Sequence, residues 1–155
     1  QLSKKYISVY QKGLDTFIVH RGTDDPHQAL YDINYISSKN EDYIHQRIQE
    51  TRDILESVPK SHRIFSTGHS LGGLVAAKSL LDPEINKRTI AVETFNPLTH
   101  ITDRKYQNTH KITNHVIFGD VASLGHRGGK TKTYLPSIRS SLFQTLHTNH
   151  SINRF

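Results

Sequence analysis

The chain has 155 residues and a net charge of +6, and it contains no cysteine, methionine or tryptophan. This length predicts one domain with room for a hydrophobic core. The lack of cysteine excludes disulfides and thiolate chemistry, and no apolar run is long enough to cross a membrane. Residues 1–10 show no secretory signal, so the sequence does not assign the protein to a cellular compartment. Because the sequence has no initiator Met, we expect a domain excised from a longer protein.

The positive charge is concentrated in the last third of the chain. Residues 1–100 carry 12 Lys and Arg and 12 Asp and Glu, whereas residues 101–155 carry 8 and 2. Such asymmetry is typical of a segment that meets an anionic partner, either a phospholipid surface or a nucleic acid. A basic surface that serves only solubility fits equally well.

The first predicted elements alternate between strands and helices. Residues 6–10 and 16–20 are rich in β-branched and aromatic residues, and the turn chemistry between them predicts a hairpin. An Asp-Asp-Pro sequence then favours a short helix over 27–37. Apolar residues recur at helical spacing over 41–58, and Pro59 ends that helix.

The next segment is the centre of the chain. An apolar strand over 63–67 runs into Gly68-His69-Ser70-Leu71-Gly72, and small, helix-compatible residues follow. This is Gly-x-Ser-x-Gly between a strand and a helix, the form of a nucleophile elbow. The flanking glycines suit a turn too tight for Cβ atoms, and the N-terminus of the helix suits a developing oxyanion.

The rest of the chain continues the alternation. The helix after the elbow stops at the Asp-Pro pair at 82–83, and strands follow over 89–95 and 110–118. The Gly-, Lys- and Thr-rich stretch at 123–136 predicts a loop, and 137–148 a closing helix. Strands that alternate with helices imply a mostly parallel sheet with helices on both faces, a three-layer α/β sandwich.

Sites in such sheets form at the carboxyl ends of the strands. The polar residues that follow predicted strands are the turn at 21–23, Ser70, Asn96 and Asp120. A serine nucleophile needs a base, and the base needs an acid that orients it. Asp120 is the candidate acid, although an Asp at a strand end also commonly forms an Asx-turn.

The candidate bases are four histidines. His115 lies within a predicted strand and precedes Asp120, and His126 lies in a Gly- and Lys-rich loop. His147 and His150 both lie at the end of the predicted closing helix, and we prefer His150 over His147. Two His pairs, 147 with 150 and 110 with 115, lack a third ligand, so neither a metal nor another cofactor is expected.

An oxyanion hole is expected from two backbone N–H groups. One belongs to Leu71, the residue after the nucleophile, and the other comes from an earlier loop. The Arg21-Gly22-Thr23 turn after the second strand is the candidate, through the Thr23 backbone. Taken alone, this sequence also fits an ordinary strand-exit turn.

Together these motifs resemble the class 3 (fungal-type) lipase family. Residues 17–23, Phe-Ile-Val-His-Arg-Gly-Thr, are similar to the family's oxyanion strand and turn, and residues 67–73 to its elbow. Residues 93–97 and 116–121 are similar to its next strand exits. The resemblance implies one α/β-hydrolase domain over 1–155 and hydrolysis of carboxylic esters of glycerides or phospholipids.

The chain departs from the family in several places. It is short, His20 stands where the family usually has an apolar residue, and the region around His150 matches only loosely. Small versions of this domain occur in some viral proteins. The resemblance to them implies a viral domain that is associated with the virion.

The leading interpretation is a serine esterase or lipase with Ser70, His150 and Asp120 as its triad. Lys130 and Lys132 favour an anionic interface and therefore a phospholipase. The alternative is a lipase-like domain without turnover that binds a membrane or a nucleic acid through its basic third. No basic stripe interleaved with aromatics supports nucleic acid. Acyl transfer or peptide hydrolysis would use the same triad.

Overall fold

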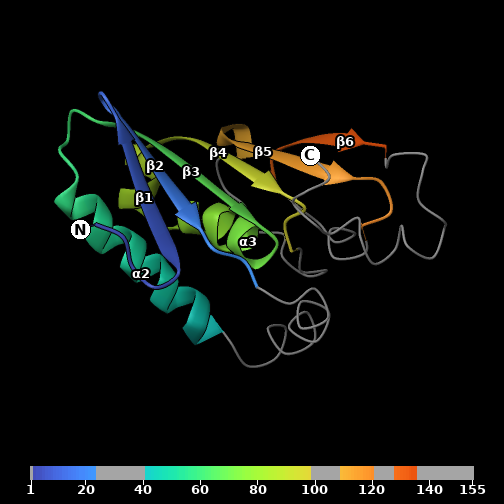
Figure 1. The fold of residues 1–155 in the computed structure, drawn as a ribbon, viewed down its shortest axis with the longest axis horizontal. Helices are drawn as coiled ribbons and strands as arrows, with labels where there is room; N and C mark the ends of the chain where they lie inside the picture. Colours follow the sequence, from blue (N-terminus) through green and yellow to red (C-terminus); the bar gives the residue numbers. More distant parts are fainter. Residues whose placement is uncertain (1, 24–40, 99–108, 121–127, 136–155) are drawn as a thin grey trace.

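The computed structural model describes residues 2–23, 41–98, 109–120 and 128–135. Within these ranges the chain forms a six-stranded sheet whose strands lie side by side in sequence order (Figure 1). The first two strands pair antiparallel as a hairpin, and every later neighbour pairs parallel, which confirms the predicted mostly parallel sheet. The strands are β1 (Ile7–Lys12), β2 (Asp15–His20), β3 (Arg63–His69), β4 (Thr89–Phe95), β5 (Ile112–Ile117) and β6 (Lys130–Tyr134).

The α-helices of the described ranges all pack on one face of the sheet. Ile18, Ser66, Val92 and Ile112 are register partners in neighbouring strands, so they form one row across this face. Ile18 and Ile64 share a buried cluster with α2 and α4, while Val92 and Ile112 share one with α3. No helix within the described ranges is long and apolar enough to span a bilayer. The helices are α2 (Glu41–Ser57), α3 (Leu71–Lys78) and α4 (Pro83–Arg88), with short 3₁₀ turns η1 (Ser79–Leu81) and η2 (Thr109–Lys111).

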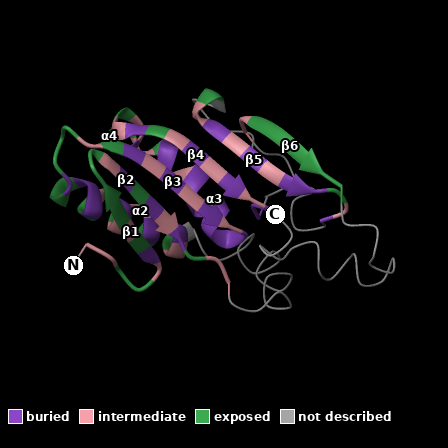
Figure 2. Cartoon of the chain, turned by 45° about the horizontal axis from the view of Figure 1, so that its top comes forward, coloured by how far each residue is buried: buried purple, intermediate pink, exposed green. Residues whose placement is uncertain are grey.

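The opposite face is less buried. Buried and half-buried residues alternate along β3 and β4, as the purple and pink bands of Figure 2 show. Aromatic side chains line this second face, with Phe17 stacked on Phe65 at 5.3 Å between ring centroids and Phe95 on His115 at 4.9 Å. The helices predicted over 27–37 and 137–148 lie outside the described residues, so a second helical layer stays a prediction.

Two predictions about elements were wrong. The predicted loop at 123–136 contains β6, an edge strand that is exposed at every position. Its Lys-Thr-Lys-Thr-Tyr sequence is polar on both faces, so it has no apolar alternation to reveal it. The Asp-Pro pair at 82–83 stops one helix but also begins α4, because the Asp82 side chain accepts hydrogen bonds from the N–H groups of Glu84 and Ile85.

Candidate active site

Ser70 lies at the junction of β3 and α3 in a strained backbone conformation. Its φ is 54° and its ψ is −124°, and the residue is 1% exposed. A non-glycine residue held at positive φ costs on the order of 1–3 kcal/mol, and such strain is typical of a nucleophile on a sharp strand-to-helix turn. The Ser70 N–H donates to the Phe95 carbonyl at 3.1 Å, and the Leu98 N–H donates to the Ser70 carbonyl at 3.0 Å. These two hydrogen bonds therefore hold the elbow against the end of β4 and the residues that follow it.

The glycines on either side of Ser70 allow backbone segments to touch. A Cβ atom on Gly68 would lie 2.3 Å from the carbonyl carbon of Gly72. A Cβ atom on Gly72 would lie 2.2 Å from the carbonyl oxygen of His20. The first turn of α3 consequently packs directly on the backbone at the ends of β2 and β3. The sequence predicted the tight turn at Ser70 but not the contact with β2.

The turn formed by Arg21, Gly22 and Thr23 lies against this elbow. It follows β2, whose last residue is the register partner of Gly68. A Cβ atom on Gly22 would lie 2.5 Å from the His69 carbonyl oxygen and 3.5 Å from Ser70 Cβ. The two predicted oxyanion donors therefore come from segments in contact: Thr23 follows Gly22, and Leu71 is the first residue of α3.

Asp120 lies beyond β5 at the same edge of the sheet. The residue is 1% exposed, and its N–H donates to the Ile117 carbonyl at 3.1 Å. One strand, β4, separates β5 from the strand that carries Ser70, so the two strands are about 10 Å apart. The predicted bases His126, His147 and His150 lie outside the described residues, and the triad as a unit stays a prediction.

Asn96 fixes the edge between Ser70 and Asp120. It is fully buried directly after β4 and has a φ of 40°, a conformation that Asn tolerates. Its N–H donates to the His115 carbonyl at 2.8 Å, and its Oδ1 accepts from the Ile117 N–H at 2.9 Å. The sequence marked Asn96 as a strand-exit residue without a role, and the structure gives it a structural one.

His115 is held in a separate polar group. Its Nε2 lies 2.5 Å from a Glu93 carboxylate oxygen, and its Nδ1 lies 2.8 Å from the Tyr134 hydroxyl. These side chains lie on the sheet face opposite the row that contains Val92 and Ile112. His115 therefore has its own partners, and no group of three metal-ligating side chains occurs within the described ranges.

Two basic residues are buried beside the turn formed by Arg21, Gly22 and Thr23, the predicted oxyanion turn. His20 is 1% exposed, and neither ring nitrogen has a hydrogen-bond partner among the described residues. Burial, aided by the nearby charge of Arg47, lowers the pKa of His20 to about 3, so the ring is neutral at physiological pH. Arg47, also 1% exposed, comes from α2. Sequence reasoning missed it, although a charged residue three positions after Ile44 in an apolar helical stripe was a usable signal.

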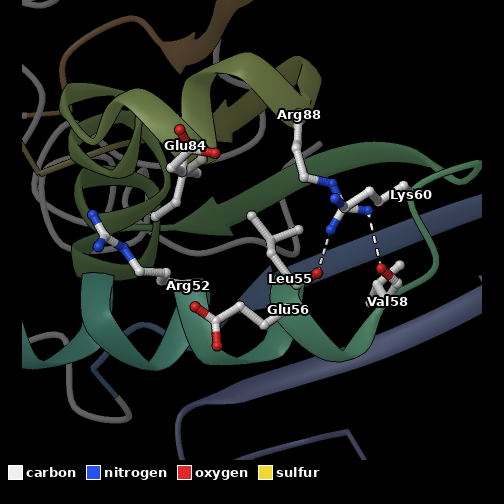
Figure 3. A pocket seen from close by; sticks show the side chains of 8 residues that line it. Arg52, Leu55, Glu56, Val58, Lys60, Glu84 and Arg88 are labelled. Atoms are coloured by element: carbon white, nitrogen blue, oxygen red, sulfur yellow. Dashed lines mark hydrogen bonds between the residues drawn. The ribbon is translucent and has the colours of Figure 1, made fainter.

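A cavity of about 270 Å³ lies between α2 and α4, away from the elbow (Figure 3). Arg88 reaches across it and donates hydrogen bonds to the carbonyls of Leu55 and Val58. None of the predicted site residues lines this cavity. Its lining comprises Arg52, Leu55, Glu56, Val58, Lys60, Glu84, Ile85 and Arg88.

Comparison with known proteins identifies the fold. The sequence matches no protein-family model and no curated protein. The structure is similar to a lipase from Rhizopus microsporus var. chinensis, with a TM-score of 0.58 and 17% identity over 82% of this chain. It is also similar to the Lip2 lipase from Yarrowia lipolytica, with a TM-score of 0.50 and 16% identity over 86% of this chain. The chain spans 56% and 66% of these two proteins. The chain has a lipase-like α/β-hydrolase fold.

Proposed function

We propose that this protein is a serine hydrolase that cleaves carboxylic esters of lipids. The observation that carries the proposal is the strained elbow at Ser70, with the Gly22 turn packed against it. A serine at a positive φ, between a strand and the positive end of a helix, is poised to attack an acyl carbon. Backbone N–H groups on both sides of it are suited to hold an oxyanion.

The proposed reaction proceeds in two steps. His150 takes the proton of the Ser70 hydroxyl as its oxygen attacks the acyl carbon, and the N–H groups of Leu71 and Thr23 hold the oxyanion. The imidazolium, oriented by Asp120, then protonates the departing alcohol, which leaves an acyl ester on Ser70. A water molecule deprotonated by the same imidazole attacks this ester, and the acid is released.

A lipid substrate is supported by exposed apolar residues at the carboxyl ends of β5 and β6. Phe118 is 65% exposed and Leu135 is 84% exposed. Lys130 and Lys132 lie exposed on the adjacent edge strand. Exposed apolar side chains at the end of a strand that carries two exposed lysines suit an interface with anionic headgroups, which favours a phospholipase over a neutral-fat lipase.

Covalent labelling tests the proposal. A fluorophosphonate ester should add once to the wild type and not to Ser70→Ala, read as a mass shift of the intact protein. Ester turnover should fall by on the order of 10⁴-fold or more in Ser70→Ala. Loss of labelling in His150→Ala but not His147→Ala would assign the base, and the reverse result would assign it to His147.

The competing reading is a lipase-like domain without turnover. The exposed lysines of β6 are compatible with it, because they would also attract an anionic partner. Steeply salt-dependent binding to nucleic acid or vesicles, without fluorophosphonate labelling of folded protein, would replace the hydrolase proposal with this one.

A further inference from the structure

Arg47 is the largest fully buried side chain of the described residues, and it joins α2 to the oxyanion turn. Its guanidinium donates to the Arg21 carbonyl at 2.7 Å and to the Tyr6 carbonyl at 3.2 Å. The rings of Tyr6 and Tyr43 lie 5.5 and 5.7 Å from its guanidinium carbon. No carboxylate within the described ranges forms an ion pair with it. Burying an arginine carries a large desolvation penalty, and an apolar side chain would hold the helix on the sheet without that penalty.

The contact fixes a specific peptide group. The Arg21 N–H donates to the Tyr6 carbonyl at 2.9 Å, and its carbonyl accepts from Arg47, so both backbone groups of Arg21 are held. The next residue, Gly22, is pressed against the His69 carbonyl of the elbow. Only the two dihedral angles of Gly22 then separate the held Arg21 peptide from the Thr23 N–H.

We propose that Arg47 is a positioning residue for the oxyanion hole and acts through the Arg21 carbonyl on the Thr23 N–H. This inference rests on the proposed ester hydrolysis. A donor displaced by about 1 Å can lower turnover by on the order of 100-fold without any change in the groups that bind the substrate. We therefore expect Arg47 to affect kcat more than KM.

The test compares Arg47, which lies on α2, with Arg88, which lies on α4 and binds the C-terminal end of α2. Arg47→Met removes the bond to the oxyanion turn, and Arg47→Lys keeps a charge that can reach one carbonyl. Arg88→Met is the matched control, because Arg88 also donates to backbone carbonyls, those of Val58 and Pro59, at the far end of α2. Each variant is assayed with a soluble ester, and its unfolding midpoint in urea is measured in parallel.

We expect kcat to fall by about 10- to 100-fold in Arg47→Met, with KM within about twofold of wild type. Arg47→Lys should recover part of the loss, and Arg88→Met should keep the wild-type kcat even if its urea midpoint falls. Should Arg47→Met not fold, Arg47→Lys carries the same comparison.

A double-mutant cycle adds a readout that a purely structural role would not change. Gly22→Ala should displace the same turn, because its Cβ would meet the His69 carbonyl. If both substitutions act on the Thr23 N–H, the loss of kcat in Arg47→Lys with Gly22→Ala should be smaller than the product of the single losses.

The outcomes separate this inference from the proposed function. Unchanged kcat in a folded Arg47 variant, or multiplicative losses in the cycle, would overturn the role of Arg47 while leaving the hydrolase intact. Absence of fluorophosphonate labelling in the wild type would overturn both.

Discussion

The buried imidazole of His20 ties stability to pH. Because its pKa is about 3 in the folded protein, against 6.5 ordinarily, the unfolded chain binds a proton between these values that the native state does not. The stability that this difference provides is complete above pH 6.5 and is lost as pH falls toward 3. The slope that one proton contributes in that window is at most about 1.4 kcal/mol per pH unit.

His20→Leu should therefore flatten the pH dependence of stability. Urea unfolding at pH 4, 5 and 7 should show a smaller loss of unfolding free energy at acid pH than in the wild type. The same change at the exposed His45 is the control for the loss of an imidazole from the surface. An equal slope in His20→Leu and wild type would contradict the effect of burial on this pKa.

For single residues, the sequence was informative where the backbone geometry requires particular residue types at a fixed spacing. Gly68 and Gly72 flank Ser70 because backbone atoms must meet there, and that constraint is visible in the letters. Arg47 and His20 were not assigned a role. The hydrogen bonds of Arg47 go to main-chain carbonyls, and His20 has no hydrogen-bond partner among the described residues, so no side-chain pattern in the sequence records their contacts. The choice between His147 and His150 depends on tertiary placement that no local pattern contains.

Among the elements, the position of α3 allows little change, because its backbone touches that of β2 and β3. Gly72→Ala should place a methyl group 2.2 Å from the His20 carbonyl oxygen, so the helix must move off β2. We expect unfolding free energy to fall by about 2–4 kcal/mol and fluorophosphonate labelling to slow at least tenfold. Both are measurable on one preparation by urea unfolding and intact mass.

Gly13→Ala is the matched control for that change. Gly13 has a φ of 59°, and nothing lies within 4 Å of a Cβ built there. Its substitution should cost only the backbone strain, about 1 kcal/mol, with the labelling rate unchanged. If Gly72→Ala behaved like Gly13→Ala, the close approach of α3 to β2 would be refuted.

The elements themselves were predictable where their periodicity was strong. β4 was predicted at its observed bounds, and α2 within one residue, because Thr89 and Pro59 mark sharp changes in pattern. β6 was missed because an edge strand bordered by water needs no apolar face. α4 was missed because the same Asp-Pro pair both ends and begins a helix.

At the scale of the whole molecule, the charge asymmetry predicts a direction of approach to a membrane. Lys130 and Lys132 lie on β6, one outer strand of the sheet, whereas Lys12 ends β1, the other outer strand, and Lys60 precedes β3. Replacing the first pair by serine should weaken binding to anionic phospholipid vesicles on the order of 10- to 30-fold at low salt. Replacing the second pair should change it by less than threefold. If both double substitutions weakened vesicle binding equally in a sedimentation assay, binding would depend on the net charge of the protein and not on the position of the lysines.

The strand order of the sheet has a consequence for how the chain assembles. Each described strand pairs with the one that precedes it in the sequence. The strand synthesised last is therefore always the outer strand, to which the next strand can pair. None of the six described strands must be inserted between two that have already paired. The sheet can therefore be built from the N-terminal hairpin onward during synthesis, and the edge that carries Ser70 gains Asp120 only after β4 and β5 have docked.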